Sequence, residues 1–277
     1  MGRVILCETT PATISYIFPN TKIEVFSYEE LCYYLFNNIA LVNEEYISAP
    51  MFQWIEEELK LSELAGMLRG QKRKGAALAD LLMTILTYKE YYTVAEVKEF
   101  IVRMEKLNGL TAPHFRKLQA DGYLRYHKYL KAITIYDEIL VRYPELKNNK
   151  PLLASIYHNK AVALANNFEQ EKAMAAYQKA YELNKDPKSI YAYLLLMAIT
   201  KGQIEVKVMA KYYGVEDMVE KVLDAVQDAE TDMKGSSIYH RLQKALFHYE
   251  KQNMTDYDKR MNAVLEQLKS EFREQTV

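Results

Sequence analysis

Residues 120–136 read ADGYLRYHKYLKAITIY, and residues 161–177 read AVALANNFEQEKAMAAY. In both stretches a large residue follows the first alanine by three places, a second alanine follows it by twelve, and a tyrosine comes four places after that. Alanines at this spacing let two helices approach closely, and the large residues fill the spaces beside them. The repeated pattern therefore predicts pairs of packed helices, an architecture whose surface holds partners.

Helical periodicity continues to both sides of these two stretches. The chain has 9 Gly and 7 Pro in 277 residues, which leaves little room for the many turns of a β-sandwich or barrel. We therefore predict a mainly α fold, with a helical domain at 1–110 and an array of helix pairs at 111–277. In the second part we expect helix pairs at 113–126 with 129–143 and at 151–166 with 169–184, a looser region at 187–232, and a last pair at 236–251 with 255–274.

The N-terminal region contains the one stretch that favours a sheet. Residues 12–26 are rich in β-branched and aromatic residues, and Pro19-Asn20 separates them into two runs. This pattern predicts a small β-hairpin, which needs helices to lean on. Helix starts are then expected at Ser27 with Glu30, at Ala49-Pro50, at Ser62 for a short helix to about Arg69, at Ala76 for a helix to about Tyr91, and at Thr93 with Glu96.

Charge and apolar content argue against several classes of protein. A net charge of −1 disfavours a surface that coats nucleic acid or membrane. Cys7 and Cys32 lie far apart, so they suggest neither a disulfide framework nor a zinc site. The longest apolar run, residues 190–199, is about half of what spans a bilayer, and residues 4–7 are too few for the apolar part of a signal peptide. We therefore expect a cytoplasmic protein with no membrane partner.

Residues 113–187, about a quarter of the chain, resemble tetratricopeptide repeats, which are antiparallel helix pairs of about 34 residues with small residues at set positions. Ala161, Ala173 and Ala180 occupy three such positions in the second unit. The first unit has Ala120, Ala132 and Ile139 at the same places, with the large residues Tyr123 and Tyr136 beside them and Pro144 at the closing position.

The match also departs from the family in ways that predict an irregular array. His127 and Phe168 stand where the family favours a glycine between the two helices of a pair. The second unit follows the first by 41 residues, from Ala120 to Ala161, so an extra turn is expected at 146–151. Unrelated helical hairpins that share the pattern by chance are the alternative interpretation.

The resemblance implies a concave face, formed by the first helix of each pair, that binds a peptide or a partner helix. A non-enzymatic adaptor or regulator is the function it implies. Asp121 stands where members that hold a peptide's C-terminal carboxylate have an asparagine, and its charge would repel that terminus. A basic or mixed-charge segment, or a helix, fits better. The side chains expected on the concave face are Lys117, Asp121, Leu124, Arg125, His158, Asn159, Val162 and Asn166.

Motifs for catalysis, cofactor binding and metal binding do not occur in the sequence. There is no GxSxG, P-loop, GxGxxG or HExxH pattern. His240 and His248 are eight residues apart and could share a helix face, but no carboxylate lies between them to complete a metal site. We therefore expect no catalytic residues, no cofactor and no metal ion.

Residues 69–75 read RGQKRKG and form the sharpest charge feature. Their cations, Arg69, Lys72, Arg73 and Lys74, could contact phosphate, which gives an alternative function as a nucleic-acid-associated regulator. No aromatic residue lies among them to stack on a base, so we expect a solvated basic loop. An enzyme with scattered catalytic residues is a third interpretation. Because the ends of a short array need covering, a homodimer would also be compatible with the sequence.

Overall fold

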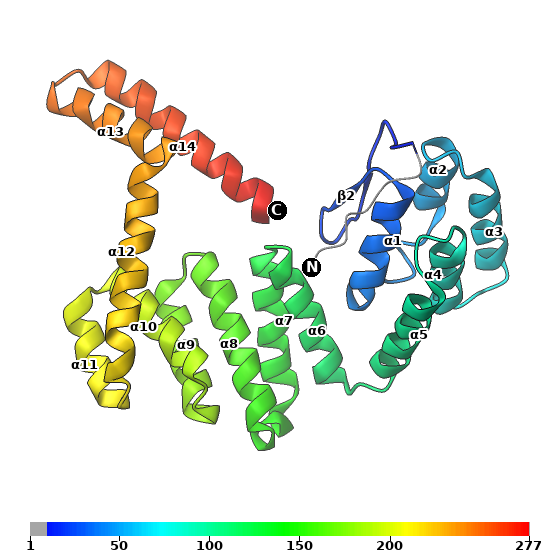
Figure 1. Ribbon diagram of the computed structural model, residues 1–277, viewed down its shortest axis with the longest axis horizontal. Helices are drawn as coiled ribbons and strands as arrows, with labels where there is room; N and C mark the ends of the chain where they lie inside the picture. The colour runs from blue at the N-terminus through cyan, green and yellow to red at the C-terminus, as the bar shows by residue number, and fades with distance from the viewer. Residues whose placement is uncertain (1–9, 277) are drawn as a thin grey trace. The chain divides into compact units, whose positions relative to one another are not determined.

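The computed structural model describes residues 10–276 and divides into two compact units, Met1–Gly122 and Tyr123–Val277. The described elements are almost all helices, together with one small antiparallel sheet (Figure 1). The predicted fold class, mainly α with a small hairpin, is confirmed. The division between the units falls within helix α6 (Ala112–Arg125), later in the chain than the boundary expected near residue 110.

The first unit combines the hairpin with five helices and most of α6. Its other elements are β1 (Tyr16–Ile17), β2 (Glu24–Val25), α1 (Tyr28–Asn37), a 3₁₀ turn (Ile39–Leu41), α2 (Ala49–Glu57), α3 (Ser62–Arg73), α4 (Leu78–Thr87) and α5 (Val94–Asn108). The strands are antiparallel, with Ile17 opposite Glu24. Phe18 follows β1, is fully buried, and stacks on Tyr34 of α1 with ring centroids 3.7 Å apart. The hairpin thus gains from a helix the support that two strands lack alone.

Capping residues fix the starts of α1 and α5, as predicted. The Ser27 hydroxyl accepts a hydrogen bond from the Glu30 N–H at 3.1 Å, and the Glu30 carboxylate accepts one from the Phe26 N–H at 2.6 Å. At α5 the Thr93 hydroxyl accepts from the Glu96 N–H at 3.3 Å, and the Glu96 carboxylate accepts from the Thr93 N–H at 2.8 Å. These bonds satisfy backbone donors that a helix start leaves without partners.

Two helices of the first unit differ in length from the prediction. Helix α3 begins at Ser62, but it continues to Arg73 rather than ending near Arg69. Gly70 does not end it, because a glycine inside a helix costs only about 1 kcal/mol. Gly75, at φ +74, follows instead in the left-handed conformation that suits a glycine after a helix. Helix α4 covers only Leu78–Thr87 of the expected 76–91.

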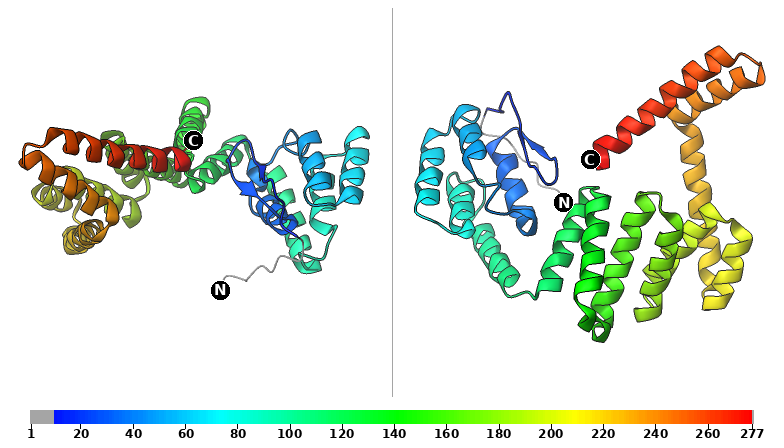
Figure 2. Two further views of the ribbon diagram at one scale, coloured as in Figure 1. Left: turned by 90° about the horizontal axis from the view of Figure 1, so that it is seen from above. Right: turned by 180° about the vertical axis from the view of Figure 1, so that it is seen from behind.

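The second unit contains two of the predicted helix pairs, 151–166 with 169–184 and 236–251 with 255–274, whereas most of the first helix of the pair expected at 113–143 belongs to the first unit. Its elements are α7 (Tyr129–Arg142), a 3₁₀ turn (Pro144–Asn148), α8 (Lys150–Asn166), α9 (Gln170–Asn184), α10 (Pro187–Thr200), α11 (Gln203–Tyr213), a 3₁₀ turn (Glu216–Met218), α12 (Val219–Gly235), α13 (Ser237–Glu250) and α14 (Met254–Thr276). The first 3₁₀ turn is the extra turn expected between the two repeat-like units. Helices α7 to α10 form a row, and α12 leads from it to the hairpin of α13 and α14 (Figures 1 and 2).

The alanines of the second repeat-like unit are buried between α8 and α9. Ala161, Ala173 and Ala180 are all fully buried, and Leu164 and Tyr177 are nearly so. The small side chains let the two helices lie close together over most of their length, as the pattern predicted.

Most of the region expected to be loose, 187–232, is instead packed onto the array, and only its last residues, 227–232, are all exposed. Ile190 and Leu194 of α10 are fully buried, as are Val206 of α11 and Val222 of α12. They belong to one apolar cluster with residues of α8 and α9. The apolar residues of α10 lie around much of its circumference, which is typical of a helix covered on several sides.

Non-glycine residues take the left-handed conformation at the turns between paired helices. His127 lies between α6 and α7 at φ 58, and Phe168 lies between α8 and α9 at φ 61. These are the two positions where tetratricopeptide repeats favour glycine. His127 and Phe168 thus take the left-handed conformation that a glycine would adopt more easily. The Phe168 side chain is 70% exposed, and its ring lies 5.6 Å from that of Phe272 in α14.

Two alanine substitutions at helical glycines are expected to change stability in opposite directions. A Cβ added to Gly122 would lie 2.9 Å from atoms of the buried Leu41 side chain, whereas one added to Gly70 would meet nothing within 4 Å. Gly70→Ala should raise the free energy of unfolding by about 0.5–1 kcal/mol through helix propensity. Gly122→Ala gains the same term but overpacks the core, which costs about 1–3 kcal/mol.

Urea unfolding of the two variants followed by circular dichroism provides the measurement. Because both glycines lie inside helices, the difference between the variants isolates the contact with Leu41. Equal stabilisation by both alanines would show that Leu41 moves aside without cost.

Candidate functional site

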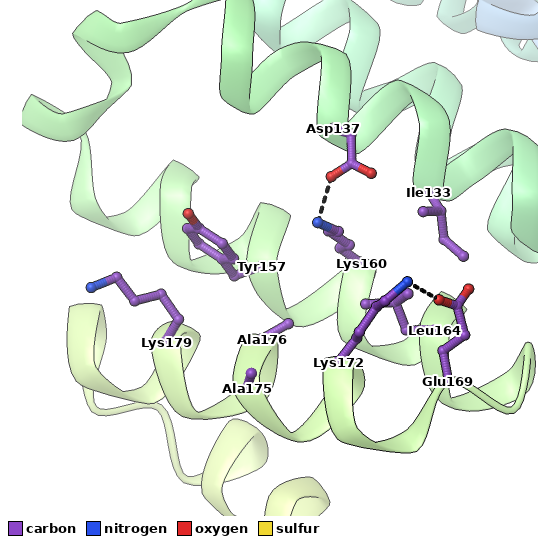
Figure 3. Close-up of a pocket in the computed structure, with 10 residues that line it drawn as sticks. All are labelled: Ile133, Asp137, Tyr157, Lys160, Leu164, Glu169, Lys172, Ala175, Ala176 and Lys179. Carbon is purple, nitrogen blue, oxygen red and sulfur yellow. Dashed lines mark hydrogen bonds and ion pairs between the residues drawn. The ribbon is translucent and has the colours of Figure 1, made fainter.

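A cavity of about 510 Å³ opens on the second unit between α7, α8 and α9 (Figure 3). Its floor and walls combine apolar and charged side chains from the three helices. Those from α7 are Ile133 and Asp137, those from α8 are Tyr157, Lys160 and Leu164, and the rest are Glu169, Lys172, Ala175, Ala176 and Lys179.

Helical spacing places these side chains together. On α8 the lining residues are three and four apart, so they share one face. On α9 the lining residues include Ala175 and Ala176, which lie between Lys172 and Lys179 in the sequence. The methyl side chains of the two alanines are small, so they leave space for the cavity. Small residues thus serve two purposes on α9: some let it pack against α8, and Ala175 and Ala176 leave space for the cavity.

Two ion pairs border the cavity. Lys160 of α8 pairs with Asp137 of α7, and Lys172 pairs with Glu169 at 2.5 Å (Figure 3). The hydrogen bond from Lys172 lowers the pKa of the Glu169 carboxyl, and a second bond from Asn167 acts in the same direction. The bond to Glu169 in turn raises the pKa of Lys172. Both pKa shifts favour the charged forms of Glu169 and Lys172 at neutral pH.

The concave-face residues predicted on α8 lie on the other side of that helix. His158, Asn159, Val162 and Asn166 are about half a turn away from the side chains that line the cavity, given 3.6 residues per turn. The His158 ring nitrogen Nδ1 lies 2.9 Å from the Ser189 hydroxyl of α10. Asn166 donates to the Val162 carbonyl at 2.8 Å. This face of α8 thus bonds in part to its own helix and to α10.

The concave-face residues predicted on α6 are divided between the two units. Lys117 and Asp121 belong to the first unit and form an ion pair at 2.6 Å, with side chains 16% and 24% exposed. Leu124 and Arg125 belong to the second unit. Neither unit by itself brings all eight predicted residues together. The Asp121 carboxylate was expected to repel a peptide's C-terminal carboxylate, but Lys117 already balances its charge.

The basic run is a helix end rather than the predicted loop. Arg69, Lys72 and Arg73 lie in the last turns of α3, where cations are favourable beside the helix C-terminus. Lys74 follows as the C-cap residue. Arg69 pairs with Glu56, and the Lys72 ammonium donates to the Glu44 carbonyl at 3.2 Å and lies 3.5 Å from its carboxylate. Two of the four cations therefore already have anionic partners.

The cavity residues were not among the sequence candidates, although the sequence contains a signal for them. Lys160, Lys172 and Lys179 recur along α8 and α9 beside the pair Ala175-Ala176. The sequence analysis did not consider these lysines, and the resemblance to tetratricopeptide repeats directed attention to the opposite face of α8.

Among residues 10–276 there is no group of three or more His, Cys, Asp or Glu side chains placed to hold a metal ion. None of the described helices combines the length and the apolar content that crossing a membrane requires. Comparison of the chain with protein-family models found no match, and neither did the comparisons with curated proteins and with solved structures.

Proposed function

We propose that this chain is a non-enzymatic, cytoplasmic protein-interaction module that binds a short helix or peptide of a partner protein in the cavity between α7, α8 and α9. The observation that carries the proposal is the cavity itself, an open hollow with an apolar floor and fixed charges at its border. The buried alanines and the left-handed turns at His127 and Phe168 support a distant relation to tetratricopeptide repeats.

The shape of the cavity favours a helical occupant. Helices α7 and α9 flank α8, so a partner helix laid along α8 would place an apolar stripe over Ile133, Tyr157 and Leu164. Three lysines and two carboxylates line the hollow. Each of the three lysines already pairs with a carboxylate, since the Lys179 ammonium lies 3.7 Å from the Glu182 carboxylate. The occupant should therefore carry mixed charge beside its apolar stripe, as was also expected for an occupant of the concave face.

The electrostatics of the cavity support binding over catalysis. A general acid or base works best with a pKa near the operating pH. The pKa of Glu169 is lowered and that of Lys172 is raised, so both shifts lead away from neutrality. The basic run of α3 does not favour the nucleic-acid alternative, because Arg69 and Lys72 are already engaged with Glu56 and Glu44.

Selection of random linear peptides displayed on phage against the full chain, followed by fluorescence anisotropy on the selected peptides, tests the proposal. Ala175 is exposed on the cavity floor, so Ala175→Arg should fill the hollow while leaving the helix folded. We expect it to weaken binding by about tenfold or more, equivalent to about 1.4 kcal/mol. The matched control is Val141→Arg, which adds the same charge to a residue of α7 that is 80% exposed and outside the cavity.

Failure to enrich any peptide, or equal binding by the two arginine variants, would contradict the cavity as the binding site. Loss of binding in Asn159→Ala without loss in Ala175→Arg would move the site to the predicted concave face.

A further inference from the structure

The hairpin of α13 and α14 has a second hollow, of about 350 Å³, whose chemistry differs from that of the cavity above. Its lining includes no carboxylate. The residues are His240, Gln243, Lys244, Phe247 and His248 from α13 and Arg260 from α14.

Helical spacing explains why the cations converge. His240, Lys244 and His248 follow one another at intervals of four residues, so they share a face of α13. Arg260 faces them from the antiparallel helix α14. The sequence suggested that the two histidines share a face, and a metal site would have needed a carboxylate beside them. The structure supplies two further cations there, which would repel a metal ion and attract an anion.

The charges of this hollow are available to a ligand. Lys244 and Arg260 have no hydrogen bond or ion pair with any residue that the structure describes. At the edge of the hollow, the Asp256 carboxylate lies 3.8 Å from Nδ1 of His248. In the first cavity, by contrast, Lys160 and Lys172 both pair with carboxylates.

The histidine geometry adds donors to these charges. Nδ1 of His240 lies 2.8 Å from the Ser236 carbonyl, an acceptor, so this nitrogen carries the hydrogen and donates. Phe247 is 53% exposed and forms an apolar wall, with the Lys251 ammonium 5.6 Å from its ring centroid.

We propose that this hollow binds the phosphate group of a phosphate monoester. A dianionic phosphate has three strong acceptor oxygens, which suits cationic donors arriving from two helices. The volume exceeds what the phosphate alone needs, so the rest of the ligand would lie against Phe247. The site is distinct from the cavity of α7 to α9, and it does not depend on the function proposed for that cavity.

Titration of the full chain with phenyl phosphate, followed by calorimetry, tests this site. We expect binding that weakens by about tenfold or more in Lys244→Gln and in Arg260→Gln. The matched control is Arg241→Gln, on α13 but outside the hollow, where the arginine instead bonds to Gln267. All three arginine and lysine side chains are exposed, so the variants should keep the fold, as far-UV circular dichroism would verify.

No heat of binding with phenyl phosphate, or the same affinity in Arg260→Gln as in the unaltered chain, would overturn the site. One further ligand identifies the source of the phosphate. A phosphoserine peptide that binds more tightly than phenyl phosphate would indicate a phosphorylated protein, and the reverse order would indicate a small phosphorylated molecule. Either order supports the site.

Discussion

Replacing Leu194 by alanine is expected to lower the free energy of unfolding of the second unit by about 2–5 kcal/mol. Leu194 is fully buried in α10 and belongs to the apolar cluster shared by α8, α9, α11 and α12. The substitution removes its transfer free energy from water and also leaves a cavity, because neighbouring helices fixed by their own contacts relax only in part. A loss of this size is a large fraction of the stability of an ordinary domain.

Ile199→Ala is the matched control, because Ile199 lies on the same helix and is 64% exposed. Surface substitutions of this kind usually change stability by about 0.5 kcal/mol or less. Hydrogen exchange followed by mass spectrometry, on peptides from 187–213, gives the local stability of both variants. Equal protection in the two would mean that α10 is not the packed centre of the array.

Phe18→Ala should destabilise the first unit by about 3–5 kcal/mol. The Phe18 ring is fully buried and stacks on Tyr34, and its edge meets the ring of Tyr16 with centroids 5.2 Å apart. Without that ring the hairpin loses its main contact with α1. A hairpin of two short strands has little stability of its own, so we expect it to detach before the helices unfold.

Ile17→Ala provides the comparison, because Ile17 is the preceding residue and its side chain, 48% exposed, points to the other face of the strand. The chain's single tryptophan, Trp54, reports on the outcome. Its indole N–H donates to the Ile14 carbonyl at 2.7 Å, so its fluorescence is sensitive to the hairpin. A Phe18→Ala chain whose Trp54 emission and urea midpoint match those of Ile17→Ala would show that the hairpin does not depend on this ring.

The sequence predicted those parts of the fold that depend on short-range patterns. The capping box at Thr93 and the alanine spacing from Ala161 to Ala180 each act within one helix or between two neighbouring helices, and both are present in the structure. The predicted end of α3 near Arg69 was wrong because the basic run 69–75 was expected to be a solvated loop, whereas α3 continues to Arg73. The packing of 187–232 was missed because it depends on contacts with α8 and α9, which no local pattern in α10 reveals.

The candidate site was harder to predict because both faces of α8 carry mixed residues. Asn159 and Lys160 are adjacent in sequence, yet Lys160 lines the cavity and Asn159 does not, because successive residues of a helix point about 100° apart. Which face is hollow depends on where α7 and α9 lie against α8, and this is a property of packing. The phosphate site shows the same limit, since Arg260 joins His240 and His248 only once α14 folds back on α13.

The two units differ in how far along the chain their contacts reach, and this difference bears on how each one forms. In the second unit, helices α7 to α11 pack mainly on their immediate neighbours in the sequence. In the first, the Gln119 side chain donates to the Ala40 carbonyl at 3.1 Å, and Gly122 lies against Leu41. Chains with local contacts fold faster, because they close only short loops. The second unit can therefore grow hairpin by hairpin as it leaves the ribosome. The first must wait for residue 122 to emerge before its last contacts close.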